Sequence, residues 1–171
     1  FKYFLTEEER VMKNRRFLII APLLFILMAS AIGLTRTNHT WINLASLPYE
    51  MKVPSDLANR ISVQEEAIDA DLLKQAKIDG AISVVSASYQ PIKGEKAWFM
   101  TVYYFNEKDL DKTMRPDEVP PYGFKLIAED GMAVSVVGPQ ESAFDPKSQD
   151  GKNYAMLYDI LYEKKSYRFI R

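Results

Sequence analysis

An uncharged stretch of 18 residues, FLIIAPLLFILMASAIGL, occupies positions 17–34 of this 171-residue chain. As a helix it extends about 27 Å, close to the roughly 30 Å thickness of the hydrocarbon core of a bilayer. Eleven of the 18 residues are Leu, Ile or Phe, which partition favourably into a membrane. We therefore expect residues 17–34 to form a single transmembrane helix in contact with the lipid bilayer.

Basic residues flank this stretch mainly on one side. Lys13, Arg15 and Arg16 precede it directly, whereas only two basic residues follow it within about twenty positions. Short segments rich in Lys and Arg stay in the cytoplasm. The pattern predicts a cytoplasmic basic tail at 1–16 and a single-pass protein of the cell membrane whose C-terminal domain is extracytoplasmic.

Two other interpretations of the apolar stretch stay open. Ala29-Ser30-Ala31 has the small-x-small spacing of a signal-peptidase site, which fits a cleaved signal peptide. A buried helix of a soluble protein is the second alternative, although so evenly apolar a helix seldom fits inside a small domain. Continuation of the apolar stretch to Leu34, and three glutamates in the preceding tail, favour an uncleaved signal-anchor.

Composition limits the chemistry that we expect. The chain has no cysteine, which excludes disulfides, thiolate metal sites and cysteine nucleophiles. His39, the single histidine, has no carboxylate near it in the sequence to orient it for catalysis. The net charge of -1 provides no attraction to nucleic acid. We therefore predict no catalytic residue, no cofactor and no metal site, and a small cysteine-free domain is typical of a bacterial envelope protein.

The segment at 35–54 is predicted to be a juxtamembrane tether, followed by a β-rich domain at 55–171. Its Trp41 is expected at the membrane interface, where amphipathic rings collect, and Lys13, Arg15 and Arg16 flank the other end of the apolar stretch. Packing of Trp41 on the domain is the alternative.

A helix is predicted at 62–80. Ser62-Val63-Gln64-Glu65 has the pattern of a capping box, an apolar stripe follows, and Gly80 provides a stop. The rest of the chain favours strands, which we place at 81–90, 97–105, 122–129, 132–137, 154–162 and 166–170. The spacing of Met156, Leu157, Ile160 and Leu161 also suits a helix, but the tyrosines of 154–162 favour a strand.

Bulky side chains on both faces place the strand at 97–105 in the centre of a sheet. Asp130-Gly131 predicts a tight hairpin between two other strands. The fold class expected is α+β and β-rich: a transmembrane helix, then an antiparallel, sandwich-like extracytoplasmic domain with one flanking amphipathic helix. The segment at 122–131, an alternating aromatic strand ending in an acidic-Gly turn, resembles small immunoglobulin-like domains of bacterial envelope proteins, and that resemblance also implies a β-sandwich.

Candidate functional residues come from the high aromatic content. Tyr103, Tyr104, Tyr158 and Tyr162 fall on predicted strands, where an exposed aromatic strip is suited to binding a partner. Packing within the sheet is the alternative explanation. Four carboxylate pairs lie in predicted loops, at Asp109/Asp111, Asp117/Glu118, Glu129/Asp130 and Asp145/Asp150. Loops carry such acids for solvation, and Pro146 and Lys147 interrupt the ligand spacing of a calcium loop at 145–151.

These features predict a non-enzymatic, membrane-anchored envelope protein that binds or scaffolds another envelope or membrane protein. The first alternative is the ligand-binding or sensor domain of a receptor. The second is an enzyme that uses two carboxylates on envelope polysaccharide.

Overall fold

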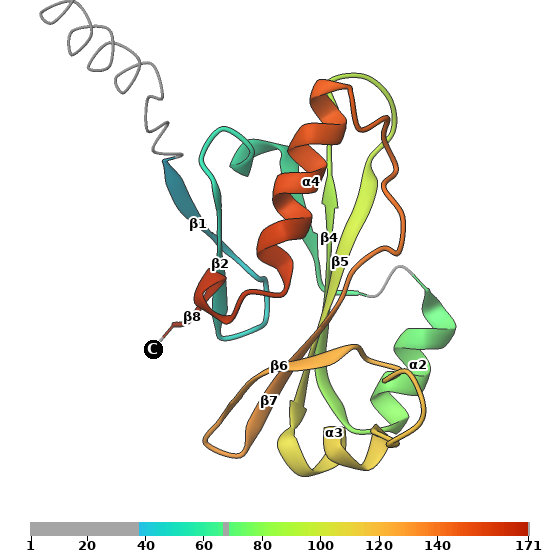
Figure 1. The fold of residues 1–171 in the computed structure, drawn as a ribbon. Helices are drawn as coiled ribbons and strands as arrows, with labels where there is room; N and C mark the ends of the chain where they lie inside the picture. Colours follow the sequence, from blue (N-terminus) through green and yellow to red (C-terminus); the bar gives the residue numbers. More distant parts are fainter. Residues whose placement is uncertain (1–37, 67–68, 171) are drawn as a thin grey trace, which may run out of the picture. The chain divides into compact units, whose positions relative to one another are not determined.

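The chain is described by a computed structural model that covers residues 38–66 and 69–170. The fold is α+β with two antiparallel sheets (Figure 1). The smaller sheet has the order β1-β2-β8, with β1 at His39–Asn43, β2 at Tyr49–Pro54 and β8 at Tyr167–Phe169. The larger has the order β3-β4-β5-β7-β6, from Ile61–Gln64, Ala81–Tyr89, Ala97–Asn106, Met132–Val137 and Phe124–Glu129.

Three α-helices and two short 3-10 helices complete the described part. The α-helices are α2 (Ala70–Ile78), α3 (Glu107–Thr113) and α4 (Gln149–Leu161), and the 3-10 helices are η1 (Ala58–Arg60) and η2 (Lys164–Ser166). The predicted basic tail and transmembrane helix, with Lys13, Arg15 and Arg16, lie outside the described residues. Within residues 38–66 and 69–170, no helix has the length and apolar character needed to cross a membrane.

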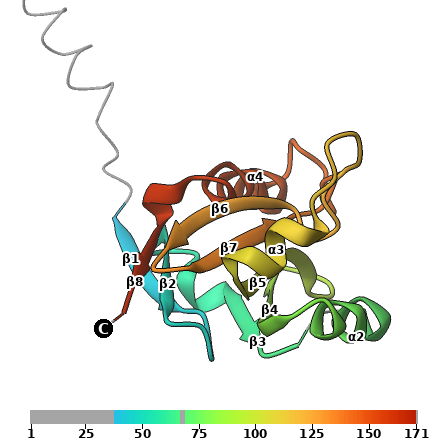
Figure 2. The ribbon, with the colours of Figure 1, turned by 90° about the horizontal axis from the view of Figure 1, so that it is seen from below.

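Strand β5 is central, as its bulky sequence predicts. It pairs with β4 on one side and with β7 on the other, and both of its faces are covered. In Figure 2 the three-stranded sheet lies on one side of the five strands and α2 on the other. The tight turn predicted at Asp130-Gly131 is confirmed, because both residues have positive φ and they connect β6 to β7.

A β-bulge in β5 interrupts the simple alternation of its side chains between the two faces of the sheet. Ala87 pairs with Met100 but Ser88 pairs with Trp98, so Phe99 has no partner of its own. The extra residue reverses the alternation beyond it. Trp98 therefore lies on the α2 side of the sheet, where its indole N–H donates to Thr101 Oγ1 at 3.0 Å.

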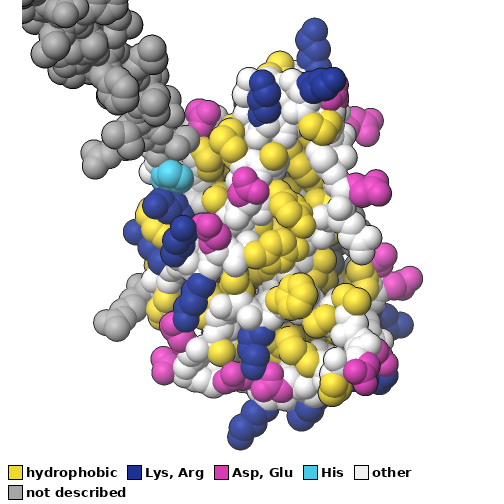
Figure 3. Space-filling view, in the orientation of Figure 1, with side chains coloured by type: hydrophobic (Ala, Val, Ile, Leu, Met, Phe, Trp, Pro, Cys, Tyr) yellow, Lys and Arg dark blue, Asp and Glu magenta, His cyan; other side chains and the backbone are white. Residues whose placement is uncertain are grey.

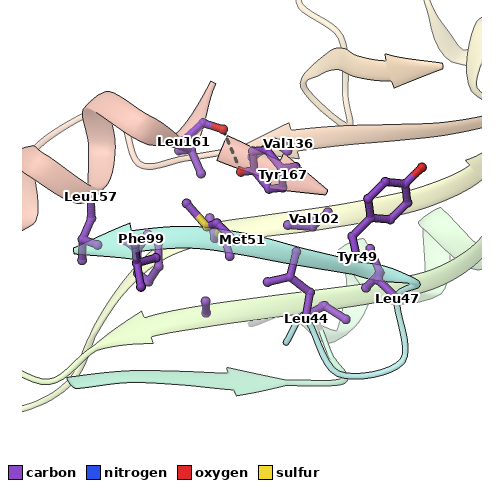
Figure 4. Close-up of a cluster of buried hydrophobic side chains, with 14 of the residues drawn as sticks. Leu44, Leu47, Tyr49, Met51, Phe99, Val102, Val136, Leu157, Leu161 and Tyr167 are labelled. Carbon is purple, nitrogen blue, oxygen red and sulfur yellow. Dashed lines mark hydrogen bonds between the residues drawn. The ribbon is translucent and has the colours of Figure 1, made fainter. Parts of the chain in front are cut away.

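The segment predicted as a tether is part of the folded domain. Its residues from Asn38 onward form β1, β2 and the turn between them, and it contributes five buried side chains to the main core: Leu44, Leu47, Tyr49, Met51 and Val53. Figure 4 shows Leu44, Leu47 and Met51 among side chains from the five-stranded sheet. The tether prediction is therefore wrong for residues 38–54, which form a strand pair because alternate residues of β2 are apolar.

The predicted helix at 62–80 is too long at its N-terminal end. Residues 61–64 form β3, which pairs with β4, and α2 begins only at Ala70. The cap is Asp69, whose carboxylate accepts hydrogen bonds from the backbone N–H groups of Asp71 and Leu72 at 2.8 and 3.1 Å. Asp satisfies the free N–H groups of a first helical turn as well as Ser does, so the more distant capping box at Ser62 is not used.

The strand predicted at 154–162 is wrong, because residues 154–161 belong to α4 and Tyr162 is its C-cap. Tyr154, Leu157 and Leu161 are buried, at the three- and four-residue spacing of a helical face. Ser148 caps the helix and accepts from the N–H of Gly151 at 2.9 Å. The strand predicted at 166–170 therefore has no strand at 154–162 beside it, and β8 pairs with β2 instead.

Two clusters of buried side chains form the core. The main cluster lies between the three-stranded sheet, α4 and one face of the five-stranded sheet (Figure 4). The second cluster lies under α2 and α3 and includes Tyr103, Phe105, Leu110 and Tyr122. The described part of the domain thus has three α-helices where the sequence predicts one flanking helix.

Candidate aromatic groove

A groove runs along the exposed side of α4, between the helix and the segment at 139–146. Its volume is about 370 Å³. Its walls are Pro139, Gln140, Glu141, Ser142 and Pro146 on the segment, and Gly151, Lys152, Tyr154, Ala155, Tyr158 and Asp159 on the helix. Figure 3 shows a band of hydrophobic side chains along this face of the domain. A concave surface with rings, prolines and a few charges is the usual character of a binding site.

Both ends of the 139–146 segment are fixed to the domain. At one end, the N–H of Gly138 donates to the hydroxyl of Tyr162 at 3.0 Å. At the other, the ring of Phe144 packs edge-on against the rings of Tyr89 and Tyr154, with centroid distances of 5.8 and 5.2 Å. Such edge-to-face pairs add about 0.5–1.5 kcal/mol beyond the area they bury. The groove is therefore held in one shape by aromatic packing.

A close approach at Gly151 brings the segment onto the helix. A Cβ atom at this position would lie 2.0 Å from the carbonyl oxygen of Asp145, a distance that no side chain tolerates. Ser148 joins the same contact, since its hydroxyl donates to that carbonyl at 2.7 Å. Glycine in the first turn of α4 is therefore required for the groove wall to lie where it does.

One of the four predicted partner-binding tyrosines, Tyr158, lines this groove, and Tyr162 packs against it from the residue that caps the C-terminus of α4. Tyr158 and Tyr162 are 40% and 38% exposed, and their rings pack edge-on at 5.8 Å. Tyr103 and Tyr104 lie elsewhere: Tyr103 is buried under α2, and Tyr104 packs partly buried on the opposite face of β5. The structure therefore separates the four residues into an exposed pair and two sheet residues on opposite faces.

The floor of the groove is electrically neutral at ordinary pH. Tyr154 donates its hydroxyl proton to the carbonyl oxygen of Trp98. Burial raises the pKa of Tyr154 to about 12, because its phenolate would be poorly solvated there. The charges lie at the rim instead, on Glu141, Lys152 and Asp159. A ligand in this groove meets an apolar floor and charged edges.

A second, larger cavity of about 640 Å³ lies between α2, α3 and the segment at 115–121. It is lined by ion pairs, with Asp109 bonded to Lys112 at 2.6 Å and Arg115 bonded to Glu118 at 3.0 Å. Hydrogen bonding from Lys112 lowers the pKa of Asp109. A general acid needs a raised pKa, so this environment is unsuited to Asp109 in that role.

Four more of the predicted carboxylates are engaged in local contacts. Asp111 and Glu129 form ion pairs with Lys125 and Lys164, and Asp145 accepts from the N–H of Lys147. Asp150 accepts from the hydroxyl of Tyr89 and from the N–H of Ile92, so its carboxylate turns toward β4. Among the residues that the structure covers, no three His, Asp or Glu side chains are grouped as metal ligands.

Some of the residues around this groove can be recognised from the sequence. Tyr158 and Tyr162 were identified as candidates, although for a strand, and their spacing of four places them on one side of a helix. Phe144 and Gly151 were missed, because their importance depends on contacts with residues distant in the sequence. The Ser148-x-x-Gly151 cap, read together with the helical spacing after it, was the signal available for α4.

Comparison with protein-family models, with curated proteins and with solved structures finds no match to this chain.

Proposed function

We propose that this protein is a membrane-anchored, non-enzymatic binding module of the cell envelope, with an extracytoplasmic domain that holds another envelope or membrane protein. The proposal combines the apolar stretch at 17–34 and its basic flank with the groove on α4. The observation that carries it is the exposed pair of Tyr158 and Tyr162, packed edge-on beside an apolar-floored groove of fixed shape.

Tyrosine pairs of this kind are suited to protein contacts. A phenol ring provides a large contact area at a small cost in conformational entropy, and its hydroxyl stays available for hydrogen bonds. Here one hydroxyl, that of Tyr162, already accepts from the Gly138 N–H, which fixes the ring. Because its ring is held in this way, binding orders few additional groups, and preorganisation of this kind favours affinity.

Site-specific cross-linking in cells tests the proposal. A photoreactive phenylalanine analogue replaces Tyr158, and in a matched control it replaces Ile78, which is 67% exposed on α2. We expect a discrete cross-linked species of higher mass from membranes carrying the Tyr158 variant and none from the Ile78 variant. The same products from both positions, or none from position 158, would contradict a partner site on α4.

Membrane placement is tested separately. Alkaline carbonate extraction should leave the full chain in the membrane pellet, and protease added to intact spheroplasts should digest the C-terminal domain while sparing the tail. A soluble product beginning near Ile32 would support the cleaved signal peptide instead.

The receptor alternative is supported by one observation, the charged cavity of about 640 Å³ between α2 and α3. That volume lies within the range of small-molecule sites. Isothermal calorimetry with polar, charged small molecules tests it, with Arg115→Ala as the variant expected to abolish binding and Lys147→Ala, outside this cavity, as the control.

A further inference from the structure

The three-stranded sheet has one face in the core and one face turned outward. Tyr49, Met51 and Val53 of β2 are buried, so the residues between them, Glu50 and Lys52, point to the opposite face. This outer face combines aromatic and basic groups. This outer face is a different surface from the α4 groove, which lies between α4 and the segment at 139–146.

Three strands contribute side chains to this outer face. Trp41 of β1 lies directly opposite Lys52 in the strand register, and Arg168 of β8 lies opposite Glu50. The guanidinium of Arg168 is 4.3 Å from the centroid of the Trp41 ring, so it reaches across β2. We call Trp41, Lys52 and Arg168 the basic aromatic platform.

Of the two cations of the platform, only Arg168 forms an ion pair with a residue that the structure describes. Arg168 hydrogen-bonds to Glu50 at 2.6 Å, whereas Lys52 forms no ion pair with any other residue that the structure describes. Lys52 also lines a cavity of about 260 Å³ with His39, Lys165 and Glu163, and in this cavity Glu163 forms an ion pair with Lys165 at 3.3 Å. In Figure 3, His39, the single histidine, is drawn beside a group of Lys and Arg side chains.

The position of the platform in the chain limits its distance from the membrane. Only residues 35–38 connect the apolar stretch to the start of β1. Four residues extend at most about 14 Å, and the headgroup region is roughly 5–8 Å deep, so β1 begins either within this region or within several Å of it. If residues 17–34 span the bilayer, β1 begins within reach of the lipid headgroups.

We propose that the outer face of the β1-β2-β8 sheet docks on the phospholipid headgroups of the membrane that anchors the chain. Trp41 lies in the interfacial zone, and Lys52 and Arg168 face the lipid phosphates. Trp residues favour this zone, and Lys and Arg near a membrane surface are attracted by anionic lipids. This inference rests on the membrane anchorage proposed above, and it does not depend on a partner at the α4 groove.

Tryptophan quenching by labelled lipids tests this docking in the full chain. The protein has two tryptophans, so Trp98→Phe leaves Trp41 as the sole emitter and Trp41→Phe leaves Trp98. Each variant is placed in nanodiscs of phosphatidylcholine and phosphatidylglycerol that contain a lipid with a nitroxide on its headgroup. We expect the emission of Trp41 to be quenched several-fold more strongly than that of Trp98.

Variants that remove one positive charge distinguish electrostatic docking of the platform from simple proximity of Trp41 to the membrane. In the Trp98→Phe background, Lys52→Gln should lower the ratio of docked to undocked protein roughly fivefold in discs with phosphatidylglycerol. Lys108→Gln, on α3, removes the same charge elsewhere and should leave quenching unchanged. Equal quenching of the two tryptophans, or equal losses with both Lys variants, would overturn the proposal. Cross-linking at Tyr158 is read independently, so either proposal can fail alone.

Discussion

Removal of residues 1–54 is expected to unfold this domain, although the sequence places the domain boundary at 55. The deletion takes away β1 and β2 with five side chains that are at most 4% exposed: Leu44, Leu47, Tyr49, Met51 and Val53. Burial of a large apolar side chain contributes about 1.5–3 kcal/mol, so the five together contribute about 8–15 kcal/mol. A typical domain has a total stability of only about 5–15 kcal/mol, so little or none remains.

Circular dichroism and thermal unfolding provide the measurement. A chain that begins at residue 38 retains both strands, and we expect it to be soluble and to unfold in one cooperative transition. A chain that begins at residue 55 should show no such transition. Because β8 pairs with β2, a peptide of residues 38–54 should restore the transition when it is added to the shorter chain. Cooperative unfolding of the shorter chain alone, at a similar temperature, would refute the reasoning.

Three further predictions concern the same domain. Val102→Asp should cost more than about 3 kcal/mol and prevent folding in thermal or urea unfolding, because Val102 is fully buried in β5 and the new carboxylate has no partner; stability equal to that of the native chain would contradict this. Tyr89→Phe should lower the free energy of unfolding by about 1–3 kcal/mol, because its hydroxyl accepts from the buried amide of Asn153 at 2.9 Å. In urea unfolding, Tyr104→Phe is the control and should change stability much less. Above pH about 10, where an exposed phenol ionises, the domain should lose stability because burial raises the pKa of Tyr154 to about 12. Because this pKa is raised in the folded state, the stabilisation is complete below pH 10 and is lost as the pH rises through about 12. Absorbance at 295 nm should show a tyrosine that ionises well above pH 10, together with unfolding. Ionisation of all tyrosines near pH 10, without unfolding, would contradict this.

The parts of the fold that sequence reasoning predicted depend on local signals. The hairpin at Asp130-Gly131 needs positive φ at two positions, and Asp and Gly provide it. Strand β5 was placed in the centre of a sheet because it is bulky on both faces, and a strand with that composition has to be covered on both sides. The mistaken strand at 154–162 shows the limit of such signals, since tyrosines favour strands on average but three of the apolar residues there repeat with helical spacing.

The candidate groove required the tertiary structure. Tyr158 on its helical wall is predicted from composition, but the wall that faces it is fixed by Phe144 packing on Tyr89, far away in the sequence. The close approach of Asp145 to Gly151 is likewise a contact between two backbones. A sequence carries no direct mark of such contacts, because each residue alone is common in loops and helix starts.

The sequence by itself determined the α+β class, the central strand, the hairpin turn at Asp130-Gly131 and the absence of cysteine chemistry. Each follows from residue type and spacing, which fix backbone conformation and periodicity over a few residues. Only the tertiary structure decided that residues 38–54 belong to the core, that β8 pairs with β2, and that Tyr103 is buried while Tyr158 is exposed. These outcomes depend on which apolar faces meet, and burial free energy is a property of the assembled contacts rather than of any local segment.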